Sequence, residues 1–444
     1  MTIHHLLTHT SGIHSYTGKP EFMKTVTMEM KPEELINSFK NDKFDFNPGE
    51  KLLYNNSGYF LLGYIVEKVS GMPFDDYLKE KFFKPLRMNN TGVHSWELNL
   101  ENEAAGYSYE TNSYKPAMKW DMSRAGGAGA IYSTVGDLYL WNEAIFNGTI
   151  LSKSSLEAAF TPAKLNDGSE ADAFGAKYGY GWMFSKLRGL ETINHSGGFD
   201  GFNAYLIRFL GQHLTIAVLT NCFPPKPPEE GSIPLVGVSI ADAAAYIYLW
   251  DQMETIKSFV EDKTVDTAVY DDYVGGYDYS PYGPILKITH EGDKLFAELA
   301  GQDKTEIFPS AKDKFFWKVT DAQVDFIRNE KGEVTHLIHH QSGMEIKAPK
   351  VKEEMPATVD ANIYDDYTGE YDFGRATLTV TREGDKLFAR MADQPKYEIF
   401  PRSETEFFWK VANAQIVFVK DEGGKVTKAV LKQAGMEIEV KKVK

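Results

Sequence analysis

The sequence predicts a mixed α/β domain followed by two all-β, barrel-like repeats. With 444 residues, the chain is too long for one ordinary core. Its first part, to about residue 255, mixes helical and strand-like apolar spacing. A segment that begins at Val269 returns, little changed, from Ile363. We therefore expect three domains, at residues 1–255, 268–350 and 361–444.

Composition narrows the possible partners. The formal net charge is −15, and no basic stretch is long or aromatic-rich enough to follow a phosphate backbone, which argues against nucleic acid. The apolar fraction of 42% is typical of a packed globular protein. The longest apolar runs, such as 214–219, are much shorter than the roughly 20 residues of a membrane-spanning helix. We expect no membrane span.

The single cysteine and the N-terminal residues give little indication of the cellular compartment. Cys222 cannot form an internal disulfide, and we expect a buried, unreactive thiol after a strand. The stretch from Met1 to Leu7 has no export-signal pattern. The chain as given is therefore expected in the cytoplasm, and the cell envelope or secretion stays open if the sequence is incomplete at its start.

The segment HHLLTHTSGI, residues 4–13, predicts a short helix and then a turn. His5 and His9 are four residues apart, a spacing that could place two metal ligands on one helix face. No acidic residue completes a metal pattern here, so we expect no metal or other cofactor, and we assign His4, His5 and His9 to packing or solvent. Ser11 is interpreted as a turn residue.

The segment LLYNNSGYFLLGYIVEKVSG, residues 52–71, predicts a helix. Asn56 or Ser57 would be its N-cap, and Gly71 stands where a helix-ending glycine belongs. The helical spacing predicts one apolar face, formed by Tyr59, Leu62, Ile65, Val66 and Val69. Taken alone, Tyr54-Asn55-Asn56 is better explained by helix capping than by chemistry.

The segment INHSGGFDGFNAYLIRF, residues 193–209, is strand-like and precedes a second strand at 214–219. The adjacent His195 and Ser196 suggest a catalytic dyad, but neighbouring strand residues point to opposite faces, so we do not expect their side chains to meet. A proline-rich surface stretch follows at 223–231, and a helix is predicted at 239–253.

Each C-terminal repeat has the pattern of strands joined by tight turns. For example, the alternating residues 378–381 predict a strand, and residues 383–386 predict the turn that follows it. Such antiparallel modules hide their edges by closing into barrels. An acidic, proline-containing linker near 351–356 separates the two copies. Asp272 recurs as Asp366, and two aromatic positions also recur, which we expect to fill the barrels: Phe316 with Phe408 and Trp317 with Trp409.

Four motifs occur in a fixed order along residues 1–250: HHLLTHTSGI, FNPGEKLLYNNSGY, GAGAIYSTVGDLYLW and INHSGGFDGF. In this order they resemble the penicillin-recognising serine hydrolases, and more narrowly the class C β-lactamase and D,D-peptidase-like branch of serine peptidase S12 type, which includes esterases and D-amino-acid peptidases. The resemblance implies an antiparallel sheet flanked by helices beside a helical subdomain. The two β modules resemble the lipocalin-like extensions of many relatives.

The resemblance also implies roles for individual residues in acyl transfer through a serine ester. Tyr54 would be the phenol that shuttles a proton, which requires nearby cations to lower its pKa. Asn56 would bind the substrate's acyl-side amide. His195-Ser196-Gly197 matches the Lys/His-x-Gly motif, and histidine there would supply less positive charge than lysine. Gly197 would admit the substrate backbone, and the Gly198 N–H would be an oxyanion donor.

One family motif has no match in this sequence: no serine is followed three residues later by lysine. The threonine match at 161–164 contains proline and lies in the wrong order. In the family, Ser-x-x-Lys precedes the segment with which this sequence begins, on a helix that follows the first strands of the sheet. We therefore expect this polypeptide, as given, to be inactive by the family mechanism.

Three explanations remain open for the unmatched motif. The sequence could be incomplete at its start, it could be a short form that acts as a non-catalytic binding or assembly protein, or another chain could supply the motif. The expected partner is a small peptide, amide or ester substrate. The β modules are expected either to gate the cleft or to bind another copy of the chain.

Overall fold

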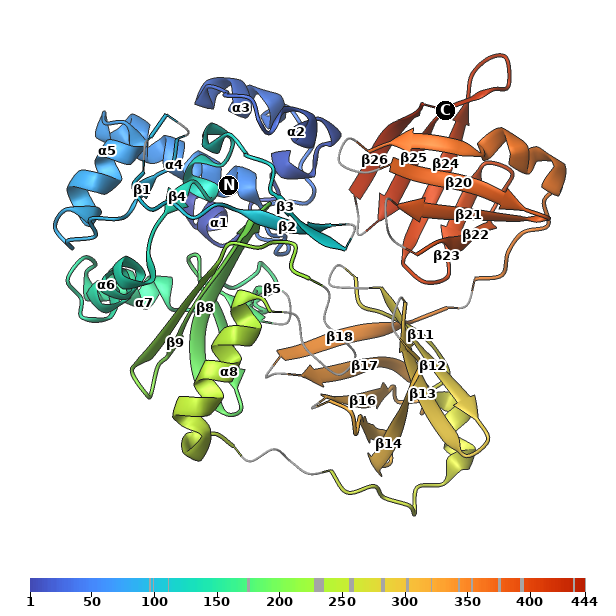
Figure 1. The fold of residues 1–444 in the computed structure, drawn as a ribbon. Helices are drawn as coiled ribbons and strands as arrows, with labels where there is room; N and C mark the ends of the chain where they lie inside the picture. Colours follow the sequence, from blue (N-terminus) through green and yellow to red (C-terminus); the bar gives the residue numbers. More distant parts are fainter. Residues whose placement is uncertain are drawn as a thin grey trace. The chain divides into compact units, whose positions relative to one another are not determined.

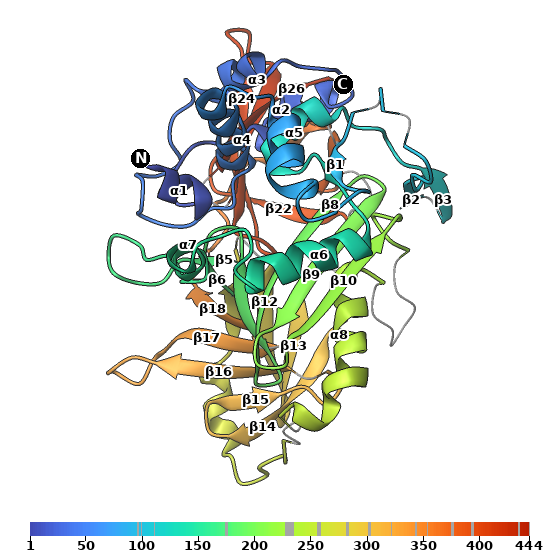
Figure 2. The same cartoon turned by 90° about the vertical axis from the view of Figure 1, so that its left-hand side faces the viewer.

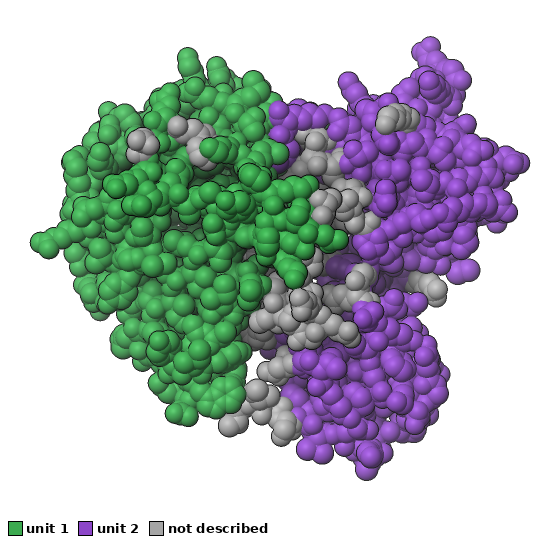
Figure 3. Space-filling view, in the orientation of Figure 1, with its two compact units in different colours: residues 1–18, 25–255 green, residues 19–24, 256–444 purple. Residues whose placement is uncertain are grey.

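The computed structural model describes all residues except 96, 99, 111, 174–175, 227–234, 255–258, 281–283, 301–302, 321, 342–343, 353, 374–376, 392–394, 434–435 and 444. Part of the proline-rich stretch at 223–231 and part of the linker at 351–356 thus lie outside the described residues. The chain forms two compact units (Figure 3), made of residues 1–18 with 25–255 and of residues 19–24 with 256–444.

Residues 1–255 alternate between helices and strands. The α-helices are α1 (Ile3–Leu7), α2 (Pro20–Thr25), α3 (Pro32–Phe39), α4 (Asn56–Ser70), α5 (Phe74–Leu78), α6 (Val135–Phe146), α7 (Lys153–Ala159) and α8 (Gly237–Leu249). The strands are β1 (Gly92–Val93), β2 (Tyr107–Glu110), β3 (Ser113–Pro116), β4 (Ile131–Tyr132), β5 (Asp172–Ala173), β6 (Ala176–Tyr178), β7 (Met183–Leu187), β8 (Leu190–Phe199), β9 (Phe202–Phe209) and β10 (Leu214–Thr220). Among the described residues, no helix has both the length and the apolar character needed to cross a bilayer.

The main sheet of this unit is antiparallel, with the strand order β10-β9-β8-β7-β6-β5. Helices cover both faces of this sheet. Alternate residues of a strand point to opposite sides, so one strand contacts helices on both faces. On β9, Ile207 packs into the cluster formed with α8, whereas Arg208 points to the other face and donates to Asn142 of α6 at 2.9 Å (Figures 1 and 2). The expected helix at 239–253 is therefore α8, extended by a 3₁₀ turn at 250–252.

Helix α4 begins one residue earlier than the predicted cap implied. The N-cap is Asn55, whose side chain accepts from the Gly58 N–H at 2.8 Å, so the assignment of Asn56 or Ser57 as the cap was wrong. The reason is local: Asn55 still has extended backbone angles, while Asn56 is already helical. The helix ends as predicted at Gly71, which has a left-handed φ of 70°.

The buried face of α4 also differs from the predicted one. Val69 is 82% exposed, whereas Ser57, Gly58, Phe60 and Gly63 are buried. Small residues face inward because α4 packs closely on the 3₁₀ turn η4 (Gly126–Ala128), where bulkier side chains would not fit. Helical spacing of large apolar residues therefore indicated the wrong side. In the same unit, Cys222 is half-buried, which corrects the expectation of a buried thiol.

The second unit contains two closed antiparallel barrels of the same strand order (Figure 1). The first consists of β11 (Gly275–Asp278), β12 (Ile285–Glu291), β13 (Lys294–Leu299), β14 (Thr305–Ala311), β15 (Lys314–Phe316), β16 (Ala322–Arg328), β17 (Val334–Gln341) and β18 (Met344–Val351). The second consists of β19 (Gly369–Asp372), β20 (Thr377–Glu383), β21 (Lys386–Met391), β22 (Tyr397–Pro401), β23 (Glu406–Trp409), β24 (Ala414–Lys420), β25 (Val426–Gln433) and β26 (Met436–Lys442). Each barrel closes by pairing its first strand with its last, which leaves no open edge.

Of the two aromatic pairs predicted to fill the barrels, the phenylalanine pair is wrong by one residue and the tryptophan pair is confirmed. Phe315 and Phe407 belong to the two interior clusters. Phe316 instead packs against Phe259 and Phe308 with ring centroids 5.3 Å and 6.0 Å apart, outside that cluster. Adjacent strand residues alternate in direction, so one phenylalanine of each pair must leave the interior. Phe408 corresponds to Phe316, and the predicted pair Trp317 and Trp409 do pack against the interior clusters.

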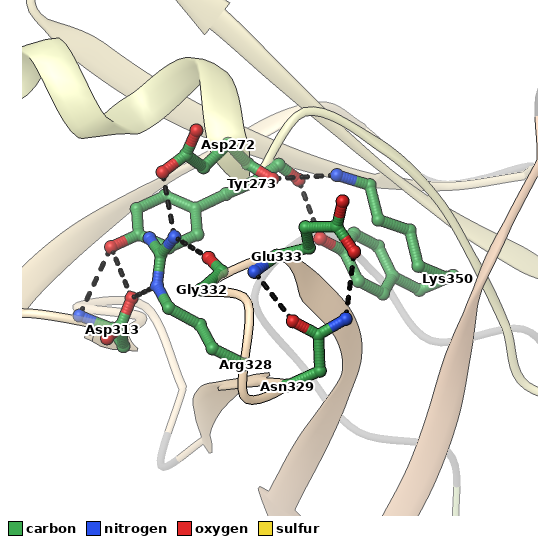
Figure 4. Close-up of polar contacts among 9 residues, drawn as sticks. Asp272, Tyr273, Asp313, Arg328, Asn329, Gly332, Glu333 and Lys350 are labelled. Carbon is green, nitrogen blue, oxygen red and sulfur yellow. Dashed lines mark hydrogen bonds and ion pairs between the residues drawn. The ribbon is translucent and has the colours of Figure 1, made fainter.

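A charged network joins a 3₁₀ turn to strands of the first barrel (Figure 4). Arg328 donates from Nε to Asp313 at 2.8 Å and from Nη1 to Asp272 at 2.8 Å. The Tyr273 hydroxyl donates to Asp313 at 2.8 Å, and Lys350 Nζ donates to the Asp272 carbonyl at 2.7 Å. These contacts fasten the 3₁₀ turn η6 (Thr267–Asp272) to the strands.

The second barrel repeats this arrangement with fewer contacts. Lys420 stands in place of Arg328 and contacts Asp366 at 2.9 Å, while Lys442 donates to the Asp366 carbonyl at 2.8 Å. The recurrence of the two aspartates in the sequence thus has a structural cause, since each one holds a 3₁₀ turn, η6 or η7 (Ala361–Tyr367), against its barrel.

Candidate functional site

The residues before α4 are held beside the end of α1 by backbone pairing. The Gly49 N–H donates to the Thr10 carbonyl at 2.8 Å, and the Leu53 N–H donates to the His9 carbonyl at 3.0 Å. Tyr54 follows directly and reaches over the His9 ring, with centroids 4.2 Å apart. Two separate sequence motifs therefore meet at this point.

Strand β8 carries the other predicted residues along a free edge. It pairs with β9 as far as Phe199, but with β7 only as far as Asn194, opposite Met183. From His195 onward, no strand in the described part of the chain pairs with this edge. Ser196, Gly197 and Gly198 are exposed, and a Cβ atom at Gly197 would meet nothing within 4 Å. This stretch therefore has open space beside its backbone.

The structure brings two of the predicted side chains together. The rings of Tyr54 and His195 lie with centroids 6.1 Å apart, although they come from a loop and a strand. Asn56 is the first residue of α4, and its amide donates to Thr17 Oγ1 at 3.1 Å. His195 and Ser196 do not form a dyad: the imidazole Nδ1 lies 2.7 Å from the Ser196 backbone carbonyl.

A chain of hydrogen bonds runs through the site. The Asn55 N–H donates to His9 Nδ1 at 3.1 Å. His9 Nε2 lies 3.1 Å from the Tyr178 hydroxyl, which lies 3.1 Å from His195 Nε2. His195 Nδ1 then contacts the Ser196 carbonyl. Tyr178 ends β6, so this chain links α1, the start of α4 and the main sheet.

Burial sets the charge of these groups. It lowers the pKa of His9 to about 3, with a further contribution from His195, and it also lowers the pKa of His195. Burial raises the pKa of Tyr54, and it raises that of Tyr178 well above the ordinary value. At neutral pH both imidazoles are therefore uncharged and both phenols are protonated. These shifts run against the cationic surroundings that the proton-shuttle role of Tyr54 requires.

Sequence reasoning missed two members of this cluster. His9 was assigned to packing or solvent; it is buried, but it also connects Asn55 to Tyr178. Tyr178 was not singled out, and it lies 169 positions from His9 in the sequence. A usable signal was the position of His9 directly after the helical segment, where glycine or asparagine is more usual. Ser11 is the expected turn residue, since its hydroxyl accepts from the Ile13 N–H at 3.3 Å.

A pocket of about 430 Å³ lies beside α1. At its wall His4 Nδ1 contacts the Tyr180 hydroxyl at 2.9 Å. None of the predicted site residues lines it. The pocket is lined by His4, Glu157, Ala158, Thr161, Pro162, Ala163, Lys164 and Tyr180.

Comparison with known families separates the first unit from the two barrels, although the first match ends at residue 237, where α8 begins. Residues 1–237 match the family model described as Beta-lactamase. Residues 261–351 and 353–444 each match the family described as Domain of unknown function (DUF3471). The two DUF3471 matches coincide with the two barrels.

Two curated relatives illustrate the sequence similarity. The chain is 30% identical over 371 residues to Penicillin-binding protein 4* of Bacillus subtilis (strain 168), a match that covers 79% of this chain and 78% of the relative. It is 26% identical over 238 residues to Protein flp of Staphylococcus aureus (strain NCTC 8325 / PS 47), covering 52% of this chain and 45% of that relative. The chain thus spans less than half the length of the staphylococcal protein.

Solved structures show a more distant likeness. The octameric penicillin-binding protein homologue from Pyrococcus abyssi is 21% identical with a TM-score of 0.49, covering 88% of this chain and 77% of that one. A D-stereospecific amidohydrolase from Streptomyces sp. is 26% identical with a TM-score of 0.46, covering 55% of this chain and 72% of that one.

Proposed function

We propose, because this chain belongs to the β-lactamase family, that residues 1–255 form a serine-hydrolase scaffold for acyl transfer to which small peptides, amides or esters bind. The barrels at 268–350 and 361–444 would be separate accessory domains. The similarity to a Bacillus penicillin-binding protein over most of both chains supports this assignment.

The observation that carries the proposal is the meeting of Tyr54 and His195 beside the free edge of β8. A ligand backbone laid along this edge would pass Gly197, where space is open. The Gly198 N–H would then serve as an oxyanion donor, Tyr54 as the proton shuttle and Asn56 as a ligand for the acyl-side amide. Asn56 would have to exchange its contact with Thr17 for the substrate.

The nucleophile of this chemistry has no counterpart among the 444 residues, which contain no Ser-x-x-Lys. A serine hydrolase stripped of its catalytic residues retains an advantage over water of roughly 10³ to 10⁴, supplied by the oxyanion hole and binding. Here the N–H of the serine, the family's second oxyanion donor, would be absent as well. We therefore propose that this polypeptide alone binds its substrates without turning them over above background.

Three substrates test this proposal on the 444-residue polypeptide: a chromogenic cephalosporin, a p-nitrophenyl ester and a peptide ending in D-Ala-D-Ala. We expect background rates with all three. Clear turnover that disappears in Tyr54→Phe would show that the site works with another nucleophile, and the proposal of an inactive polypeptide would be wrong.

The DNA upstream of Met1 tests the scaffold itself. If it encodes Ser-x-x-Lys in frame, the longer polypeptide should hydrolyse at least one of the three substrates, and Tyr54→Phe should reduce its rate by 100-fold or more. A longer polypeptide that contains the motif and stays inactive would contradict the hydrolase assignment.

The second candidate function is non-catalytic binding or assembly on the same scaffold. The pKa directions favour it, since the uncharged histidines and the raised pKa of Tyr54 do not generate a phenolate. Assembly would run through the barrels. Deleting residues 361–444 should then lower the number of chains per assembly, measured by light scattering, and an unchanged number of chains would count against it.

A further inference from the structure

We propose that His9 is a positioning residue that, acting through Tyr178, fixes His195 as the uncharged Nδ1–H tautomer. The imidazole of His195 then offers no positive charge to a ligand along β8. The site would favour ligands that place a neutral carbonyl there over ligands that place a carboxylate there. This inference deepens the proposed function and rests on it for the place of the ligand.

The direction of the hydrogen bonds is set first at the Asn55 end. A backbone N–H can only donate, so His9 Nδ1, 3.1 Å away, must accept and carries no proton. A neutral His9 therefore has its proton on Nε2 and donates it to the Tyr178 oxygen. The single proton of Tyr178 can then be donated to His195 Nε2 or to the Tyr59 oxygen, with which Tyr178 also shares a hydrogen bond.

The contact with Ser196, at the other end of the hydrogen-bond chain, independently fixes which nitrogen of His195 carries the proton. A backbone carbonyl can only accept, so His195 Nδ1, 2.7 Å from the Ser196 oxygen, must donate and carries the proton. A neutral His195 therefore has a bare Nε2, which requires Tyr178 to be the donor in the bond between them. The four bonds are satisfied together by one assignment of protons, with both rings neutral.

Protonation of either ring disrupts this chain. A proton on His9 Nδ1 would face the Asn55 N–H, so two donors would meet. A proton on His195 Nε2 would displace the hydroxyl proton of Tyr178, whose oxygen already accepts from His9. Burial is the largest influence on both imidazoles and lowers both pKa values, whereas the bond from His195 Nδ1 to the Ser196 carbonyl acts in the opposite direction on His195.

The groups around His195 supply no opposing charge. Tyr54 and Tyr178 are the aromatic neighbours whose rings lie within 6.1 Å of it. On the neighbouring strand β9 the residue opposite is Leu206. Tyr59, which also packs on His9, donates its hydroxyl to the Leu7 carbonyl at 2.7 Å and shares a hydrogen bond with Tyr178. Burial lowers the pKa of His195 and the Ser196 carbonyl raises it, while no carboxylate in the described part of the chain contributes.

The backbone of His9 is a further sign that its side chain is needed. His9 has φ of 56°, in the left-handed region that costs a non-glycine residue about 1 to 2 kcal/mol. It ends α1 in a Schellman arrangement, in which the Thr10 N–H donates to the His5 carbonyl at 2.9 Å and the His9 N–H to the Leu6 carbonyl at 3.5 Å. Glycine would end the helix with less strain, and the two side-chain contacts of His9, to Asn55 and to Tyr178, are what glycine could not make.

Nitrogen NMR of the ¹⁵N-histidine-labelled 444-residue protein tests the proposal without any turnover. At pH 7 we expect His195 to show a protonated Nδ1 and a bare Nε2, and its pKa to lie below the ordinary 6.5. In Tyr178→Phe the Nε2 loses its donor while the Ser196 carbonyl still accepts from Nδ1–H, so the pKa of His195 should rise toward 6.5 and the Nε2 signal should shift. His9→Asn, which tolerates the left-handed backbone, should shift His195 in the same direction.

Tyr180→Phe is the matched control, because it removes a phenol two residues away that contacts His4 instead. It should leave the His195 signals unchanged. An Nε2–H tautomer or an imidazolium in the unmodified protein at pH 7, or unchanged His195 signals in a folded Tyr178→Phe variant, would overturn the proposal. Inactivity of a longer polypeptide with Ser-x-x-Lys would instead overturn the hydrolase assignment and leave this tautomer result standing.

Discussion

Two neighbouring asparagines, Asn55 and Asn56, have different tasks that a stability measurement can separate. Asn55 is 3% exposed; its side chain caps α4 and also donates to the Ile13 carbonyl. Asn55→Ala removes the cap and leaves a buried carbonyl without its donor, and we expect a loss of about 2 to 3 kcal/mol in the free energy of unfolding. Asn56→Ala loses one half-buried contact, to Thr17, and should cost about 1 kcal/mol or less.

Urea denaturation followed by circular dichroism measures both variants. Asn55→Asp is the control, because a carboxylate still accepts from the Gly58 N–H but can no longer donate to Ile13. The free energy of unfolding of Asn55→Asp should lie between those of Asn55→Ala and Asn56→Ala. Equal losses for Asn55→Ala and Asn56→Ala would contradict the assignment of Asn55 as the cap.

For single residues, the sequence identified Tyr54 and His195 but not the hydrogen-bonded pair His9 and Tyr178 beside them. Motif order was enough for those two residues, because the family resemblance assigns them directly. The roles of His9 and Tyr178 depend on a contact across 169 positions and on a left-handed backbone angle, and neither is visible in local spacing. The N-cap was misplaced by one residue because Asn55, Asn56 and Ser57 are all good caps, and only backbone geometry chooses among them.

Helix α4 meets the turn η4 through glycines, which gives the Gly-rich segment at 126–129 a packing role. A Cβ atom at Gly63 would lie 3.0 Å from the Gly127 Cα and 3.1 Å from its nitrogen. We expect Gly63→Ala to lower the free energy of unfolding by about 1 to 3 kcal/mol, because backbone on both sides must move. Its control is Gly136→Ala on α6, where an added Cβ meets only Thr134 Oγ1 at 3.9 Å.

The control should be neutral or stabilising by up to about 1 kcal/mol, since alanine is the better helix former. Urea denaturation of the two variants distinguishes close packing from propensity. A stabilised Gly63→Ala would mean that α4 and η4 are not in close contact.

Elements were easier to predict than their faces. Alternating residues and tight turns revealed the strands of both barrels, and closure followed from the need to hide edges. The Phe-Phe pairs at 315–316 and 407–408 show where this reasoning stops. Each pair must have one ring inside and one outside, and the repeat preserves both, so the recurrence alone could not indicate that Phe315 and Phe407 are the interior ones.

Duplication gives the whole molecule two barrels with one fold and different interiors. In the first barrel His339 Nδ1 contacts the Tyr279 hydroxyl at 3.0 Å, and its ring lies 5.4 Å from that of Trp317. Strand pairing places Leu431 at the corresponding position of the second barrel, opposite Ile416 where His339 is opposite Val324. One barrel therefore buries a titratable ring where the other buries a hydrocarbon.

This difference predicts that acid destabilises the first barrel more than the second. Burial, with a further contribution from His340, lowers the pKa of His339 to about 4 from 6.5. A base whose folded pKa is lowered stabilises the fold above its unfolded pKa, and that stability is lost as pH falls from 6.5 toward 4. The slope is at most about 1.4 kcal/mol per pH unit, or roughly 3 kcal/mol over the window. His339→Leu, which copies the second barrel, should reduce the difference and leave the contribution of His336, whose pKa is also lowered by burial and by Lys347.

Peptide-resolved hydrogen exchange, corrected for the intrinsic effect of pH on exchange rates, measures the acid destabilisation of the two barrels in the same molecule. Between pH 7 and 5, peptides of β11–β18 should lose protection relative to those of β19–β26, and in His339→Leu this difference should become smaller. His213→Asn, at an exposed position of the first unit, is the control and should leave the barrel difference intact. If the barrels lose protection equally in the unmodified protein, the neutral His339 ring contributes nothing to the first barrel's stability, and the acid response must come from groups the two repeats share.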